Sequence, residues 1–335
     1  MMQKTLLAIA IPAALLSNSV SAVELYKSDT NTFAVGGHVS GGITGSDEGE
    51  TEVNSISPRL NISATHDVGN GFTADAKAEW GLNFMTGGDT SLTTRLGYLG
   101  LTHEEYGRGV IGTQWSPYYD VAGVTDMPIY FANEFLYADH YSMGTARAEK
   151  MLSYRNGLDF GDAGVLNFGL GWQGAAGDND DRVQASLSYS ILGASLGYAY
   201  GTGSTVATGT SEDAVTQAVS LSYGSYGDGL YLAGVFAKND FVADPSFNSL
   251  GILNKTYNYE AIAAYALDNS LNISLNFEQV KDEEQNNGTL TSQSALQIEY
   301  NFSSSTMGYV GYQVDLGDDV SEDDNIWAIG ARFFL

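Results

Sequence analysis

Three arginines in the first half of the sequence lie on the polar side of segments that alternate apolar and polar residues: Arg59, Arg95 and Arg147. Each directly precedes an apolar residue, respectively Leu60, Leu96 and Ala148, so each should point to the opposite face of its strand. Arg95 should likewise lie opposite Tyr98. A guanidinium stays charged at physiological pH. Three fixed cations on one wet surface are suited to sorting ions and polar solutes by charge.

The four histidines are the side chains best suited to acid–base catalysis near neutral pH. His38 lies on the polar face of the first predicted strand, His66 and His103 lie at predicted short connections, and His140 lies in a long connection. None of these settings resembles a catalytic constellation, so a hydrolase is the weakest alternative and we predict that the chain is not an enzyme. Gly169 to Gly174 read G-x-G-x-x-G without a following helix, and no spacing matches a calcium loop. We therefore predict no cofactor and no metal site.

Period-two alternation is the strongest pattern in the sequence and predicts β-strands throughout. From Phe72 to Phe84 apolar residues occupy almost every second position, while Asp75, Lys77 and Glu79 lie between them. The same alternation recurs at 166–173, 296–302 and 327–335. We expect the apolar face to meet lipid, and we expect His38, Asp75, Lys77 and Glu79 to line a wet lumen.

The segments are about 9–11 residues long, which is the length that a tilted strand needs to cross a bilayer. A soluble β-sandwich also alternates, but its strands are typically shorter and its outward residues are polar. Short connections such as 67–71 and 303–305 alternate with long ones such as 201–215 and 239–255. Counting the segments predicts about sixteen antiparallel strands, an all-β transmembrane barrel wide enough to hold an aqueous channel.

Composition and charge agree with an exported barrel. Residues 1–22 contain Lys4, an apolar run and Val20-Ser21-Ala22, which predict a signal peptide followed by one barrel domain over 23–335. The sequence has 40 Gly, 21 Tyr and no Cys, so turns and aromatic residues abound and a disulfide framework is excluded. The formal charge of −26 argues against nucleic-acid binding, and we predict no nucleic-acid partner.

One connection, from Trp115 to Gly144, is far longer than the others and contains apolar residues that a free loop would not keep: Met127, Ile129, Phe131, Phe135 and Leu136. Long loops in compact folds are usually functional or disordered. This composition is too aromatic for disorder, so we predict that the connection folds into the barrel and narrows it. The alternative is an external lid.

Motifs around this connection carry a family resemblance. Thr94 to Leu101, Tyr118-Tyr119-Asp120, Thr125 to Pro128 and Ser153 to Asn156 resemble, in order and spacing, the constriction region of the trimeric general porins of Gram-negative bacteria. The resemblance implies an outer-membrane homotrimer with an inward-folded third loop. It also implies a passive channel for ions and small hydrophilic solutes.

The resemblance further assigns roles to single residues. Arg59, Arg95 and Arg147 would form a ladder on the wall, opposite Asp126 on the third loop. Tyr130 stands where enterobacterial porins carry a second loop acid, and Glu134 follows it. With so negative a chain we expect a weak preference for cations. The alternative is a sugar-type specific channel, in which Tyr118, Tyr119, Tyr130 and Phe131 would begin an aromatic slide.

The long acidic connections suggest a lipid partner. Asp178 to Asp181 and Glu322 to Asp324 could gather divalent cations that bridge to lipopolysaccharide phosphates.

Overall fold

A computed structural model describes residues 22–83, 85, 92–134, 136, 143–175, 180–207, 210–242, 253–283, 288–317 and 325–335. Several features predicted from the sequence lie outside this part of the chain. They are residues 1–21 of the predicted signal peptide, Phe84, Phe135, His140 and most of the two acidic connections, 176–179 and 318–324.

The described residues form strands, one short helix and two 3-10 turns. Among them the structure contains no helix long and apolar enough to cross a bilayer. The strands are β1 (Val23–Lys27), β2 (Asn31–Ser46), β3 (Glu52–Asn54), β4 (Arg59–Gly69), β5 (Phe72–Leu82), β6 (Leu92–His103), β7 (Gly107–Trp115), β8 (Arg147–Asp159), β9 (Val165–Gln173), β10 (Arg182–Ile191), β11 (Ala194–Ala207), β12 (Thr210–Ser225), β13 (Asp228–Val242), β14 (Leu253–Ala266), β15 (Leu271–Asp282), β16 (Gly288–Ser303), β17 (Thr306–Asp315) and β18 (Ile326–Phe334). The helical elements are α1 (Tyr119–Ala122), η2 (Gly123–Thr125) and η3 (Gly161–Ala163).

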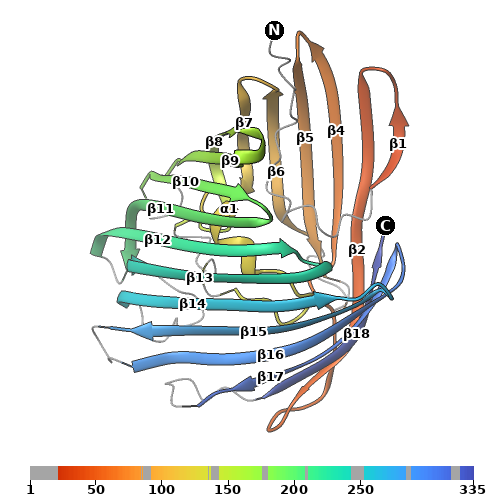
Figure 1. The fold of residues 1–335 in the computed structure, drawn as a ribbon, viewed down its shortest axis with the longest axis vertical. Coiled ribbons are helices and arrows are strands. Elements are labelled where there is room, and N and C mark those ends of the chain that lie inside the picture. The colour runs from red at the N-terminus through yellow and green to blue at the C-terminus, as the bar shows by residue number, and fades with distance from the viewer. Residues whose placement is uncertain are drawn as a thin grey trace.

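The sheet closes on itself to form a barrel. From β4 to β18 each strand pairs antiparallel with the next along the chain, β4 pairs with β2, and β18 returns to pair with β2, where Ile329 lies opposite Ile43. Of the 18 strands, β1 and β3 are short strands paired with β2, and the other 16 form the closed cylinder. The strands of the two walls cross steeply in Figure 1, as expected when strands tilt strongly in a barrel. The predicted 16-stranded antiparallel barrel is confirmed.

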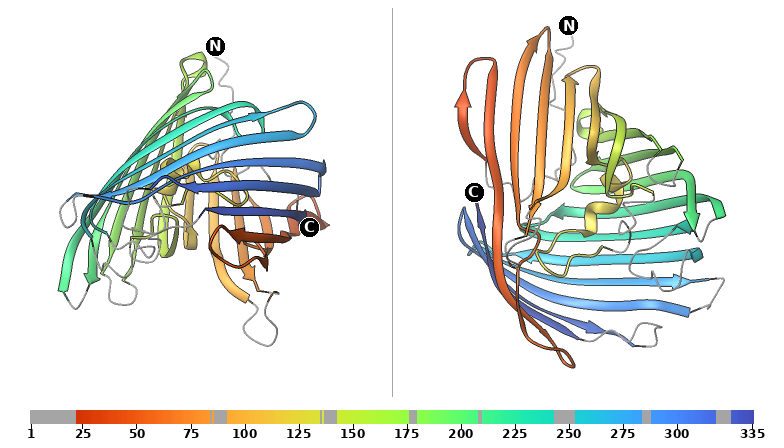
Figure 2. Two further views of the ribbon diagram at one scale, coloured as in Figure 1. Left: turned by 90° about the horizontal axis from the view of Figure 1, so that it is seen from below. Right: turned by 180° about the vertical axis from the view of Figure 1, so that it is seen from behind.

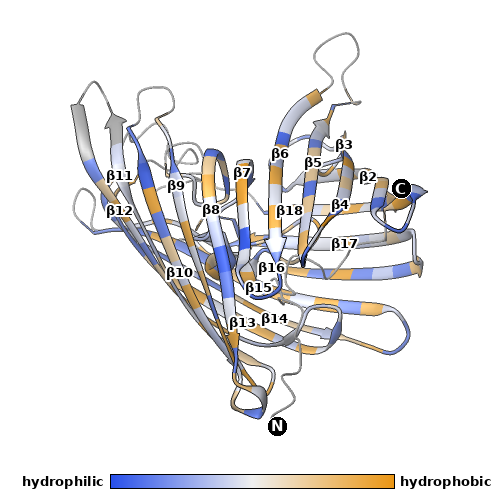
Figure 3. Cartoon of the chain, turned by 90° about the horizontal axis from the view of Figure 1, so that it is seen from above, coloured by the Kyte–Doolittle hydropathy of each residue, from blue (hydrophilic) through white to orange (hydrophobic). Residues whose placement is uncertain are grey.

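Most barrel strands present an apolar row on one face and a polar row on the other, because successive side chains alternate. In β15, Leu275 is 54% exposed, while the neighbouring Ser274 is 1% exposed. The alternating bands of hydropathy can be followed along the strands in Figure 3. The predicted apolar positions Leu170, Leu296 and Ile329 are all exposed. The apolar row is therefore the outer surface of the cylinder, and the polar row faces its interior.

Strand lengths differ from the prediction. The barrel strands run from 9 to 16 residues instead of a uniform 9–11, so several hairpins extend well beyond the span of a bilayer. The predicted long connection at 201–215 is mostly strand, since β11 and β12 stay paired out to Ala207 and Thr210. Thr, Ser and Val in this stretch are compatible with continued pairing.

Three predictions of side-chain direction are wrong. Leu96 pairs with Glu79 and Tyr98 with Lys77, so both lie on the polar row and not on the outer surface. The cause is a register shift between Glu79 and Trp80 that leaves Arg95 as an extra residue in β6. A similar shift affects the pairing of β7 with β8, where Ala148 is fully buried instead of facing outward.

The division into two rows makes Leu275→Arg a test of the fold. A guanidinium in the middle of the outer surface must leave water for lipid, so we expect a loss of about 2–4 kcal/mol in the free energy of unfolding. Urea-induced unfolding of the protein in phospholipid vesicles measures this loss.

The matched control is Thr65→Arg, because Thr65 is exposed and pairs with Asp75 on the polar row. This variant should unfold like the unmodified protein. Equal stability of the two variants would contradict the assignment of outer and inner faces.

Candidate functional site

The connection between β7 and β8 makes many of its contacts with polar rows of distant strands. Its described residues from Ser116 to Glu134, here called the inner segment, include α1 and η2. The backbone N–H of Ile129 donates to Glu299 at 3.0 Å, and that of Tyr130 donates to Gln297 at 3.0 Å. Tyr118 donates its backbone N–H to Gln184 at 3.1 Å. Figures 1 and 2 show α1 enclosed between the two walls of strands.

Buried carboxylates of the wall anchor the inner segment. Glu260 on β14 is 3% exposed, accepts the Thr125 hydroxyl at 2.5 Å and accepts the backbone N–H of Leu136 at 3.1 Å. Glu278 on β15 accepts the backbone N–H of Glu134 at 3.0 Å. These wall residues therefore hold backbone donors that would otherwise lie unpaired away from bulk water.

Apolar packing adds to these hydrogen bonds. Tyr118 and Val121 are buried against small residues of the wall, including Ala199 and Ala218. Ile129 and Phe131 pack against Ala295, Met307 and Tyr309 on the opposite part of the wall. Of the described apolar residues that distinguished this connection in the sequence, Leu136, Ile129 and Phe131 thus lie in two small cores between the inner segment and the barrel, and Met127 packs against a separate cluster that includes Tyr231.

Glu79 on β5 is the meeting point of three predicted site residues. Its carboxylate lies 3.0 Å from Nε of Arg95, 3.5 Å from Nζ of Lys77 and 3.8 Å from a guanidinium nitrogen of Arg59. Arg59 is on the polar row, as predicted, and the bulge in β6 brings Arg95 to the same side. One acid therefore partly balances three cations on this wall.

Asp126, an acid of the inner segment, contacts a side chain on which these cations act. Asp126 accepts a hydrogen bond from the Tyr119 hydroxyl at 2.6 Å, and the charges of Arg59 and Arg95 act on the same phenol. Glu134 is exposed to solvent, but the protein around it still partly desolvates its carboxyl group. Burial and repulsion by Asp126 raise the pKa of the Glu134 carboxyl above its ordinary value.

The other predicted residues surround this arrangement. Tyr130 donates its hydroxyl to Thr44 at 3.0 Å, and His38 pairs with Arg59 across β2 and β4. The charge of Arg147 acts on that of Arg59. Asp75 lies apart from the cluster and binds Arg108 through two hydrogen bonds of 2.5 and 2.8 Å.

Several residues of the site were not predicted. Arg155 binds Asp120 on α1 at 2.6 Å, and the charge of Arg332 acts on Arg59 and His38. The alternation of β8 and β18 already placed both arginines on polar rows, so the signal was present. Alternation also places Glu260, Glu278 and Glu299 on polar rows, but the sequence did not indicate which backbone groups they would bind.

The geometry does not favour a metal site or an aromatic slide. In the described part of the chain, no three His, Asp or Glu side chains are grouped closely enough to hold a metal ion. Tyr118, Tyr119 and Phe131 are buried in packing contacts. They are therefore poorly placed to form an aromatic slide along a channel.

Known proteins resemble this chain along its whole length. It is 29% identical to Outer membrane protein S2 of Salmonella typhi, with 95% of this chain and 94% of that protein covered. It is 27% identical to Outer membrane porin F of Salmonella typhi at the same coverage.

Solved structures share the fold. OmpF of Salmonella typhi in complex with daunomycin superposes with a TM-score of 0.77 at 23% identity, over 93% of this chain and 100% of that one. An anion-selective porin from Comamonas acidovorans gives a TM-score of 0.73 at 16% identity, over 91% and 100%. A family model described as Gram-negative porin matches residues 28–334. The chain therefore belongs to the Gram-negative porin family and is an outer-membrane channel protein, not an enzyme.

Proposed function

We propose that this porin is a general diffusion channel for ions and small hydrophilic solutes, and that the inner segment forms its constriction. The observation that carries the proposal is the position of Asp126 on a segment anchored to one wall, where it accepts a hydrogen bond from Tyr119, on which the charges of Arg59 and Arg95 also act. Charges separated by a water-filled gap cannot neutralise each other fully. The water between them is ordered by their field, so an apolar solute must disrupt that water to pass while a polar solute exchanges with it.

We further propose a weak preference for cations. Glu79 already offsets part of the charge of Arg59, Arg95 and Lys77, whereas Asp126 and Glu134 add negative charge on the inner segment. The formal charge of −26 should also raise the local cation concentration at the mouths of the channel.

Assembly and export belong to the same proposal. By analogy with the family we infer a homotrimer, packed through part of the exposed apolar row, and removal of residues 1–22 on export. Divalent cations at the acidic connections would link the trimer to lipopolysaccharide. Single-channel recording should then show closures in groups of three.

A sugar-specific channel would give a different single-channel recording. A specific channel would show conductance that a sugar blocks in a saturable manner, whereas a general channel should not be blocked in this way.

Asp126→Asn should reduce the preference for cations, because it removes one negative charge from the proposed constriction. Reversal potentials in a potassium chloride gradient across a planar bilayer should show a roughly twofold fall in the cation-to-anion permeability ratio, as expected for a screened charge a few ångströms away. Asp162→Asn removes the same charge in η3 and should leave the ratio unchanged. A clear anion bias in the unmodified protein would contradict the proposed selectivity.

Glu134 should make that selectivity depend on pH. Because burial and Asp126 raise its pKa, Glu134 binds a proton at a higher pH than an ordinary glutamate. As pH falls, the permeability ratio should therefore begin to fall while other carboxyls are still ionised. In Glu134→Gln this early decline should be absent, and in Glu105→Gln, at an exposed turn, it should persist. An identical pH profile in all three proteins would exclude this role.

Glu260→Ala should loosen the constriction, because Thr125 and Leu136 both lose their acceptor. We expect larger current fluctuations in single-channel records and a loss of about 2–3 kcal/mol in stability. Glu260→Gln keeps one acceptor oxygen and should show a smaller effect on both measurements. Quiet, unaltered currents in Glu260→Ala would show that the anchor does not control the channel.

A further inference from the structure

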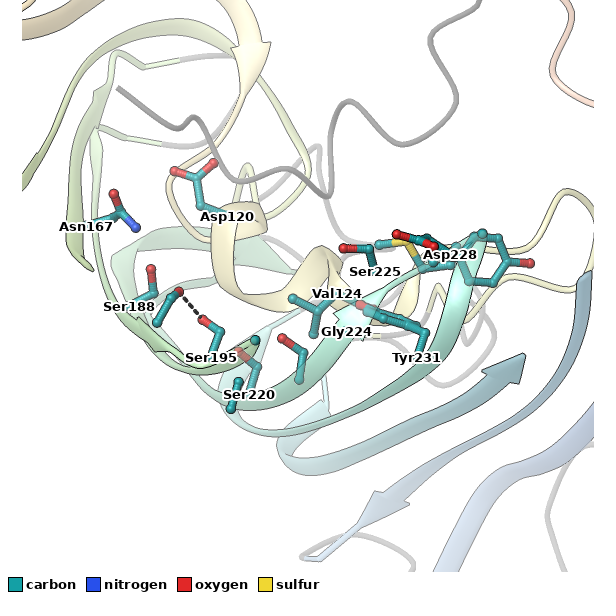
Figure 4. Close-up of a pocket in the computed structure, with 17 residues that line it drawn as sticks. Asp120, Val124, Asn167, Ser188, Ser195, Ser220, Gly224, Ser225, Asp228 and Tyr231 are labelled. Carbon is teal, nitrogen blue, oxygen red and sulfur yellow. Dashed lines mark hydrogen bonds between the residues drawn. The ribbon is translucent and has the colours of Figure 1, made fainter. Parts of the chain in front are cut away.

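A pocket of about 550 Å³ lies between the inner segment and the wall formed by β9 to β13. Asp120, Val124 and Met127 line it from the inner segment, and a group of serines lines it from the wall. The lining also includes Gly193 in the connection from β10 to β11 and Tyr226 and Gly227 in the connection from β12 to β13, which places the pocket at the end of the barrel where short turns join the strands. Figure 4 shows Ser188, Ser195 and Ser220 on one side of the pocket and Tyr231 on another.

The pocket exists because the wall side chains at this point are small. Ser188, Ser190, Ser220 and Ser222 occupy the polar rows of β10 and β12 near their turns. Their side chains are too short to reach the inner segment. On β14 to β16, by contrast, the longer Glu and Gln side chains reach it and bind its backbone.

The serine hydroxyls are available to a ligand. In the part of the chain that the structure describes, the hydroxyls of Ser188, Ser220 and Ser222 make no hydrogen bond with protein. Ser190 donates to Ser195 at 2.9 Å. Each hydroxyl can both donate and accept, so the group can match a solute that carries several hydroxyls of its own.

The charges around the pocket favour a neutral ligand. Asp120 is bound by Arg155 through contacts of 2.6 and 3.3 Å, which compensate its charge. Asp228 is exposed at the start of β13, and the described lining contains no cationic side chain. An anion would therefore lack a counter-charge, while a neutral solute avoids the cost of desolvating a charge.

We propose that this pocket binds neutral polyhydroxylated solutes of monosaccharide to disaccharide size. The serine hydroxyls would bond the solute hydroxyls, and Val124, Met127 and Tyr231 would pack against its C–H face. The volume falls within the range of small-molecule sites, and an apolar wall with a few polar groups is their usual composition. The site differs from an aromatic slide because it lies beside the inner segment. It rests on the proposed channel function in that the solute reaches it through the lumen.

The test uses the full-length protein in detergent, titrated with sucrose and followed by saturation-transfer NMR. Polyethylene glycol of similar mass serves as a probe that lacks the array of hydroxyls. We expect saturable binding of sucrose and none of polyethylene glycol. Ser188→Ala/Ser220→Ala/Ser222→Ala should weaken sucrose binding about tenfold, which corresponds to about 1.4 kcal/mol of lost hydrogen bonding. Ser63→Ala, on the polar row of β4, should leave it unchanged.

Ser222→Leu tests the space instead of the hydroxyls, since it should fill the pocket and abolish binding. Equal affinity in the triple variant, or equal binding of the two probes, would overturn the proposal. So would binding that Tyr130→Ala removes and the serine variants keep, because that result assigns the sugar to the constriction. Conductance of the same preparations separates the two proposals. A conducting protein that does not bind sucrose refutes the pocket alone, and a sucrose-binding protein that does not conduct refutes the channel alone.

Discussion

The structure depends on one requirement, which is that every backbone N–H and C=O crossing a bilayer must find its partner within the protein. Strands meet this requirement only when the sheet has no free edge. The pairing of β18 with β2 supplies the closing seam, and Ile329 opposite Ile43 is part of it. Once the cylinder is closed, alternation leaves no freedom: one row of each strand must face lipid and the other must face the interior.

A cylinder of sixteen strands is too wide for its own side chains to fill. The inner segment occupies part of that interior. Its backbone N–H and C=O groups need hydrogen-bond partners, just as those of the wall strands do. Glu260, Glu278 and Glu299 provide acceptors for these groups, so the segment is positioned by hydrogen bonds as well as by its two small apolar cores. The position of the inner segment thus depends on where wall carboxyl groups project inward.

The architecture could be predicted from the sequence because alternation depends only on the period of the strand. Arg59 and Glu79 were placed on the polar row by this argument, and they lie within 3.8 Å of each other. Alternation fails where the register shifts. The extra residue in β6 turned Arg95 inward and reversed the predicted directions of Leu96 and Tyr98, and no local pattern marks that bulge.

The contacts of the inner segment could not be predicted for a different reason. Parity places Glu260 and Glu299 on polar rows, but which polar side chain meets which backbone group depends on the register of strands far apart in the sequence. The two small cores show the same limit. The composition of the connection indicated that its apolar residues would be buried, but their partners Ala199 and Ala295 look like ordinary polar-row positions in the sequence.

The size of the polar-row side chains varies around the cylinder, and this variation connects the anchoring of the inner segment with the pocket. On β14 to β16 long carboxylates and amides reach the inner segment and hold it. Near the turn ends of β10 and β12, serines stop short of it and leave a cavity, although Gln184 farther along β10 binds it. If both sides carried long side chains, the segment would be clamped without a cavity, and if both carried serine, nothing would fix its position. The inner segment is held on one side and borders a cavity on the other because the polar-row side chains of the two walls differ in length.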